Sequence, residues 1–106
     1  MITTPDISPE KIKLTQMSKL ALSFPSLQNA PGASPWDQHK LDLWATTAIS
    51  HGERCTAQFV LSVWGHTTMK NCPWKCGPFD FVEAFSVWDD THRNAFQAWI
   101  RDPRWP

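Results

Sequence analysis

Apolar residues recur every three or four positions over most of this chain, which is the spacing of one face of an α-helix. The first such stretch covers residues 9–23, and the second covers residues 36–50. A third begins near residue 53, and the longest runs from residue 80 to residue 101. The pattern therefore predicts an all-α fold, a small single-domain helical bundle of about four helices.

The first helix has a recognisable start and one apolar face. Ser8 is a good N-cap residue, and Pro9 is favoured at the first helical position because its missing N–H is not needed there. The apolar positions on one helical face are Leu14, Met17, Ala21 and Phe24. These features predict a helix over residues 9–23.

The segment that follows, residues 24–35, reads FPSLQNAPGASP and has no helical period. Prolines, a glycine and small polar residues end the first helix and do not start another. We predict a Pro-rich linker here. It would divide the chain into an N-terminal helix with its linker, residues 1–34, and a compact helical domain, residues 35–106.

Two helices are expected in the middle of the chain. The apolar face of the first consists of Leu41, Trp44, Ala45, Ala48 and Ile49. Gly52 is expected to end it, and the segment from Cys55 to Trp64 is apolar on nearly every side. A helix that is apolar all round belongs at the centre of a domain. The stretch FVLSVW within this segment is also compatible with a short buried strand, and we favour the helix.

A long loop, residues 65–78, separates the third helix from the last. Asp80 followed by Glu83 has the spacing of a capping box, which marks a helix N-terminus. The apolar phase then continues without a slip as far as Ile100. We therefore predict one helix over residues 80–101.

Two adjacent aspartates, Asp89 and Asp90, fall on the solvent side of this predicted helix, where Asp89 can pair with Arg93. Paired carboxylates serve acid–base catalysis when burial shifts their pKa values, so we expect a solvated face here. His92 falls on the apolar face and is expected to be a core histidine that makes a hydrogen bond. The alternative is a break at residues 89–91, with one aspartate capping a separate helix.

Composition narrows the classes of function. Seven tryptophans and six phenylalanines in 106 residues predict a core dominated by large rings. Ten Lys and Arg balance ten Asp and Glu, so the formal net charge is zero and nucleic-acid binding is disfavoured. No secretory signal and no membrane-spanning run is recognisable, and the odd number of cysteines suits a reducing compartment. We expect a soluble cytoplasmic protein that does not bind a membrane.

The cysteines offer one candidate for chemistry. Cys72 and Cys76 have a Cys-x3-Cys spacing in the loop, while His51 and Cys55 are four positions apart on one helix face. Together they form a Cys3His set, which is a known structural zinc arrangement, and His66 could replace His51. The alternative is that Cys55 is a buried inert thiol and the two loop thiols bind nothing.

Three tryptophans fall outside the periodic faces and are candidate binding residues: Trp36, Trp74 and Trp105. Tryptophan is enriched at the energetic centres of protein interfaces. Because no catalytic set assembles in the sequence, we expect a protein-binding domain without enzymatic activity or a cofactor. A small zinc-binding protein is the alternative function. The alternative for the three rings is that they cap the ends of the core.

Overall fold

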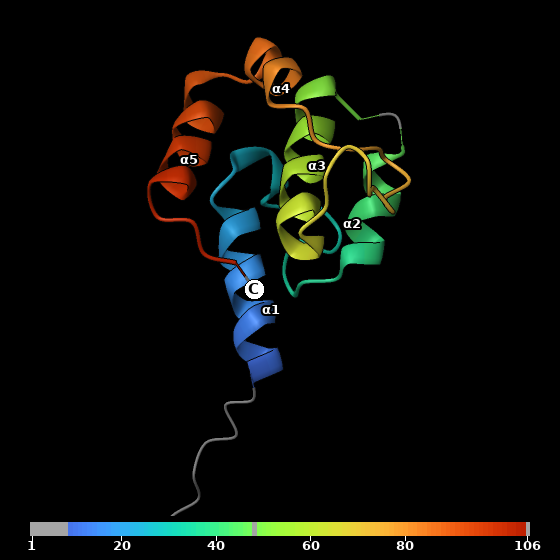
Figure 1. Cartoon of the computed structure of the whole chain (residues 1–106), viewed down its shortest axis with the longest axis vertical. Helices are drawn as coiled ribbons and strands as arrows, with labels where there is room; N and C mark the ends of the chain where they lie inside the picture. Colours follow the sequence, from blue (N-terminus) through green and yellow to red (C-terminus); the bar gives the residue numbers. More distant parts are fainter. Residues whose placement is uncertain (1–8, 48, 106) are drawn as a thin grey trace, which may run out of the picture.

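The structure is a computed structural model of the 106-residue chain, and it describes residues 9–47 and 49–105. Within these residues it contains five α-helices, one 3-10 helix and no strand. The helices surround α3 and form one globule, from which the first turns of α1 extend (Figure 1). The predicted all-α fold is thereby confirmed.

The elements in chain order are α1 (Pro9–Leu22), η1 (Pro25–Leu27), α2 (Gln38–Ala45), α3 (His51–Gly65), α4 (Phe81–Val87) and α5 (Asp90–Arg101). The helix predicted over residues 9–23 is confirmed as α1, and the FVLSVW stretch is helical because it lies within α3. Ser8, the expected N-cap, and Ala48, an expected apolar position, lie outside the described residues.

Helix α3 is the centre of the fold, as its apolar composition predicted. It begins with a capping box, in which Ser50 Oγ accepts from the Glu53 N–H and Glu53 Oε1 accepts from the Ser50 N–H, each at 3.1 Å. Residues 55–61 are all buried. The helix ends at Gly65, and its C-cap residue His66 has a left-handed φ of 50°.

Helix α2 is shorter than the predicted stretch of residues 36–50. The expectation that Gly52 ends it is wrong, because Gly52 is the second residue of α3. The termination occurs at Thr46 and Thr47, whose hydroxyls donate to the carbonyl oxygens of Leu43 and Trp44 at 2.7 and 2.6 Å. The backbone N–H groups of the same two threonines donate to the same carbonyl oxygens, at 3.1 and 3.0 Å, so the last turn closes with short-range bonds.

The single helix predicted over residues 80–101 is wrong, and the alternative break is correct. Trp88 has an extended backbone, with φ −72° and ψ 143°, and Asp89 caps α5 by accepting from the His92 N–H at 2.9 Å. The expected Asp89–Arg93 pair is also wrong, because Arg93 lies 3.5 Å from Asp90 instead. The kink lets Trp88, 3% exposed, enter the core.

Residues 24–35, predicted to be a linker, are packed against the core. Phe24, Leu27 and Ala33 are at most 1% exposed. Backbone hydrogen bonds join Leu27 N–H to Phe24, Ala30 N–H to Leu27, and Ala33 N–H to Ala30. The packing is therefore continuous up to residue 34, where the division of the chain was predicted.

Interlocking aromatic rings fill the space between η1, α3 and the C-terminal helices. We call this set the aromatic cluster, and its members are Phe24, Phe59, Phe79, Phe85, Trp88, Phe96 and Trp99. The contacting ring centroids around Phe59 are 5.0 to 5.7 Å apart. In the part of the chain that is described, no helix combines the length and the apolar character needed to cross a membrane.

Candidate functional site

The three candidate tryptophans occupy different environments. Trp36 is 6% exposed and its ring centroid lies 5.7 Å from that of Trp64, so it is part of the core. Trp74 is half-buried, and its indole N–H donates to Thr67 Oγ1 at 3.3 Å. Trp105 is 53% exposed. The binding role of these three residues stays a prediction. Trp105 has the most exposed ring of the three, so it is the one that a partner can reach most easily.

Trp105 borders an apolar groove between α3, α4, α5 and the C-terminal segment. The groove has a volume of about 540 Å³. We call it the aromatic groove, and its lining consists of Phe59, Ser62, Val63, Phe79, Phe81, Phe85, Phe96, Gln97, Trp99, Ile100 and Trp105. None of these residues is charged, and seven are aromatic.

The groove has a buried floor and an exposed rim. Phe59 and Phe96 of the aromatic cluster form part of its floor and are 3% and 8% exposed. Phe81, Ile100 and Trp105 stand at the rim with exposures of 60%, 51% and 53%. Since soluble domains rarely expose large contiguous apolar surface without use, this rim is a candidate binding surface.

Ring contacts hold the exposed Trp105 in place. Its centroid lies 5.0 Å from that of Trp99 and 5.0 Å from that of His66, in edge-to-face geometry in both cases. Such pairs add to the stabilisation that burial alone provides. An exposed ring that is already held loses little freedom when a partner covers it, which favours binding.

The loop between α3 and α4 is anchored by hydrogen bonds to buried side chains. Asp42 of α2, 7% exposed, accepts from the backbone N–H groups of Lys75 and Cys76, each at 3.0 Å. Gln58 of α3 donates to the Cys76 carbonyl oxygen at 2.7 Å. Burial and the hydrogen bond to Asp42 raise the pKa of the Cys76 thiol to about 12. A metal is therefore not needed to explain why this long loop is ordered.

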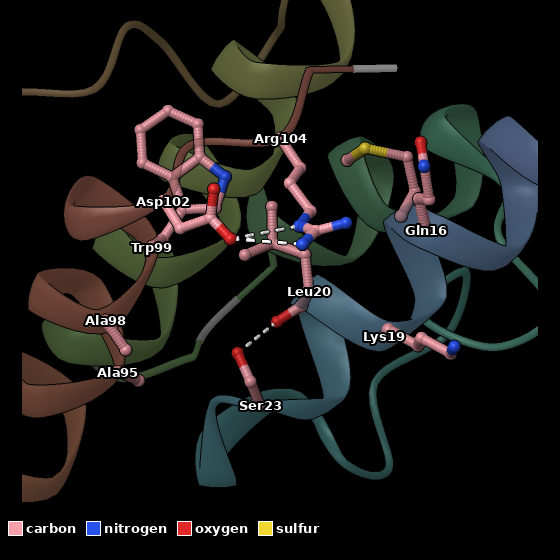
Figure 2. A pocket seen from close by; sticks show the side chains of 10 residues that line it. Gln16, Lys19, Leu20, Ser23, Ala95, Ala98, Trp99, Asp102 and Arg104 are labelled. Atoms are coloured by element: carbon pink, nitrogen blue, oxygen red, sulfur yellow. Dashed lines mark hydrogen bonds and ion pairs between the residues drawn. The ribbon is translucent and has the colours of Figure 1, made fainter.

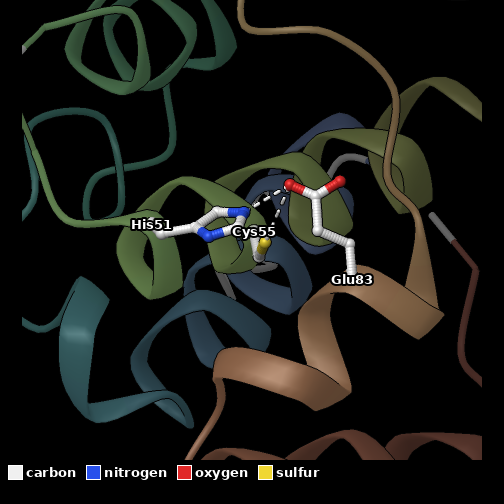
Figure 3. A group of neighbouring side chains, drawn as sticks. All are labelled: His51, Cys55 and Glu83. Carbon is white, nitrogen blue, oxygen red and sulfur yellow. Dashed lines mark hydrogen bonds and ion pairs between the residues drawn. The ribbon is translucent and has the colours of Figure 1, made fainter.

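The structure brings only part of the predicted Cys3His set together. His51 and Cys55 lie side by side on α3, as their spacing predicted, and Glu83 of α4 completes a group of three (Figure 3). Their ligand atoms all lie within 4.8 Å of one another. Among the described residues this is the group whose donors could share a metal ion, and Cys72 and Cys76 are not in it.

Glu83 has a different role from the one its sequence position suggested. Asp80 caps α4 by accepting from the N–H groups of Val82 and Glu83, at 2.9 and 3.3 Å. The carboxylate of Glu83 instead binds His51 Nε2 and lies 4.0 Å from Cys55 Sγ. Burial and the nearby Glu83 charge raise the pKa of the Cys55 thiol to about 11. This thiol is therefore protonated near neutral pH and is a poor nucleophile.

A second polar cluster lies near the start of α3. His92 is 9% exposed, its Nδ1 is 2.6 Å from Asp89 Oδ1, and its Nε2 is 2.9 Å from Ser26 Oγ. The order of these groups is that of a Ser-His-Asp triad. They border a small cavity of about 150 Å³.

The contacts around this cluster favour a structural role. The Ser26 backbone N–H also donates to His92 Nε2, at 3.3 Å, so the one lone pair of that nitrogen already has a donor. The Ser26 hydroxyl donates its proton to Thr56 Oγ1, at 3.3 Å. These bonds satisfy a buried imidazole and connect η1 to α5. They do not leave Nε2 free to take a proton from Ser26.

A further hollow of about 530 Å³ lies between α1 and the C-terminal segment (Figure 2). Its charged groups include Asp102 and Arg104, whose side chains are 3.1 Å apart, 73% and 72% exposed, and paired with each other. Exposed ion pairs contribute little free energy. Trp99 also lines this hollow, and its buried indole N–H has no hydrogen-bond partner among the described residues. The charged pair at the edge of the hollow is exposed, so it gives little reason to assign a charged ligand here.

The fold and the groove define a small all-α domain with an exposed, ring-lined apolar groove. No protein-family model matches the chain, and neither a curated protein nor a solved structure does so. Its function must therefore be inferred from its own geometry.

Sequence patterns missed two participants in these clusters. Ser26 lies in the stretch predicted to be a linker and meets His92 only because η1 packs against α5. Glu83 matched a capping box, so its carboxylate was assigned to its own helix. The unbroken apolar phase predicted for residues 80–101 places Phe81 and Ile100 on one face, whereas the structure exposes both. The alternative break at residues 89–91 is the signal in the sequence that argues against one continuous face.

Proposed function

We propose that this chain is a protein-binding domain and that the aromatic groove receives apolar side chains of a partner protein. The observation that carries the proposal is the exposed rim of Phe81, Ile100 and Trp105 above a floor of buried rings. Large apolar residues that remain exposed beside a preformed groove are a recurring feature of interfaces.

The lining indicates the chemistry of the partner. Because no charged residue lines the groove, a charged ligand would lose its hydration there without gaining an ion pair. Its ring-lined volume of about 540 Å³ suits a few bulky side chains of the kind that an apolar helix face presents. We therefore place a protein segment rich in apolar residues in the groove, with neither nucleic acid nor membrane as the partner.

The proposal includes no catalytic activity and no cofactor for this surface. The groove contains no titratable group, and general acid–base or nucleophilic catalysis needs one. The three free cysteines suit a reducing compartment, so we place the interaction in the cytoplasm.

The test compares rim variants with an exposed apolar residue elsewhere. A partner recovered from cells with the full chain is purified, and its affinity is measured for wild type, Trp105→Ala, Phe81→Ala and Leu43→Ala. We expect each rim substitution to weaken binding by about 2 kcal/mol, the cost typical of an interface hot spot. Leu43 is 61% exposed on α2 and outside the groove, so its substitution should have no effect.

Two controls complete the experiment. Thermal melts of each variant should show an intact fold, because the substituted side chains are more than half exposed. Affinity should change little between low and high salt, because the groove is uncharged. Unchanged binding by both rim variants, or an occupant that is only a second copy of this chain, contradicts the proposal.

A further inference from the structure

We propose that His51, Cys55 and Glu83 form a zinc-binding site that bridges α3 and α4 (Figure 3). The three side chains offer an imidazole nitrogen, a thiolate sulfur and a carboxylate oxygen, which are the donors that protein-bound zinc uses. They come from two helices and converge on one point, with every pair of donor atoms within 4.8 Å.

The distances between these atoms are close to those that zinc requires. Bonds of about 2.0–2.3 Å in a tetrahedron separate neighbouring donor atoms by roughly 3.3–3.8 Å. Cys55 Sγ and Glu83 Oε1 are 4.0 Å apart, so only a small approach is needed. The hydrogen bond between His51 and Glu83 must open to admit the ion.

The side chains that must move are about half exposed, so no close packing opposes their movement. The His51 and Glu83 side chains are 51% and 47% exposed, whereas Cys55 is 1% exposed and fixed in the core. Two mobile ligands can therefore close on a metal held by one fixed ligand. The exposure of this side also leaves a fourth position to water, as in sites with three protein ligands.

The charges near the thiol favour a cation. The carboxylate of Glu83 lies 4.0 Å from Cys55 Sγ and accepts a hydrogen bond from His51. Zinc would replace the Cys55 proton and neutralise part of this negative charge.

Occupation of the site would fasten α4 to the central helix. Helix α4 has seven residues, of which Ala84 alone is buried, and Phe85 joins it to the aromatic cluster through Trp88 and Phe96. Phe81 and Phe85 of the same helix line the aromatic groove. The metal would thus stabilise one wall of the groove, but the site does not depend on the proposed protein binding.

The experiment titrates the chelator-treated full chain with Zn²⁺ alone by calorimetry and with Co²⁺ alone by absorption. We expect one ion per chain, a thiolate–cobalt absorption band and a higher melting temperature with zinc. Cys55→Ser and Glu83→Gln should each weaken zinc binding by about a hundredfold or more, because losing a ligand costs at least as much as losing an outer partner.

The matched control is the double variant Cys72→Ser with Cys76→Ser, which leaves the proposed ligands in place and should keep wild-type zinc affinity. Glu83 is half-exposed, so Glu83→Gln remains informative even if Cys55→Ser fails to fold. Absence of zinc binding by wild type, or binding lost in the double variant and kept in Glu83→Gln, overturns the site. Trp105→Ala should bind zinc normally, so failure of the groove and failure of the metal site are distinguishable.

Discussion

His92 is a buried imidazole with both ring nitrogens in hydrogen bonds. Nδ1 faces Asp89, and Nε2 faces the hydroxyl and the N–H of Ser26. Leaving either nitrogen without a partner in the core would cost about 1–3 kcal/mol. A constellation that resembles a catalytic triad is therefore explained by the need to satisfy a polar ring beside Phe24 and Trp88.

The charge of Asp89 should make stability depend on pH. Hydrogen bonds from the backbone N–H and the ring of His92 hold the pKa of this exposed carboxyl below its usual range. A lowered folded-state pKa adds stability above the unfolded-state pKa of about 4, and this stability is lost as pH falls through the folded value.

We therefore expect the unfolding free energy of wild type to fall more steeply than that of Asp89→Asn between about pH 5 and pH 2. The measurement is urea unfolding at a series of pH values. Asp90→Asn is the control, because Asp90 carries the neighbouring charge and does not cap α5. Parallel pH profiles for wild type and Asp89→Asn would show that the cap does not depend on the charge.

At the scale of elements, Trp88 decides that the C-terminal region is two helices. Its ring contacts Phe24, Phe79, Phe85 and Phe96 with centroids 5.6 to 5.9 Å apart. Its indole N–H donates to Thr56 Oγ1 at 2.8 Å, and both groups are buried. Breaking the helix loses a few backbone bonds, but it permits this burial and lets Asp89 cap α5.

Trp88→Ala should destabilise the protein by ~3–5 kcal/mol, because it removes a buried ring and leaves a cavity. Trp88→Phe should cost less, since it keeps a ring and loses the bond to Thr56. Trp105→Ala is the matched control at an exposed position and should cost about 1 kcal/mol or less. Equal losses for Trp88→Ala and Trp105→Ala in denaturant unfolding would contradict this account of the cluster.

At the scale of the whole molecule, the N-terminal segment shares the core with the remainder of the chain. Met17, Ala21, Phe24 and Leu27 are at most 1% exposed. The Phe24 centroid lies 5.7 Å from the rings of Phe59 and Trp88, which belong to the other side of the predicted division. The hydrophobic core is thus shared by residues on both sides of residue 34.

A fragment of residues 35–106 should therefore lose cooperative unfolding, because removing the N-terminal segment exposes one side of α3. Calorimetry or urea unfolding followed by near-ultraviolet circular dichroism measures this. The control is a variant that lacks only residues 1–8. It should unfold as the full chain does, because it keeps all of α1 and η1. Cooperative unfolding of the 35–106 fragment, at a stability near that of the full chain, would support the predicted division at residue 34.

Local chemistry in the sequence predicted the all-α class, the start of α1 and the central position of α3. The apolar periodicity, together with the helix-breaking residues between the periodic stretches, was sufficient for these predictions. The reason is that helical hydrogen bonds join residues only four apart. Asp80 also capped α4 where the sequence indicated. The break at Trp88 appeared only as an alternative, because an uninterrupted apolar phase also fits two short helices that pack on the same cluster.

Tertiary structure alone decided which residues meet. Glu83 reached His51 and Ser26 reached His92 because α4 and η1 pack against neighbouring elements in particular orientations, across 32 and 66 positions of sequence. The exposure of Phe81 and Ile100, and the burial of Trp36, were decided in the same way. Helix orientations depend on how all side chains in the core fill space together, and no local pattern contains that information.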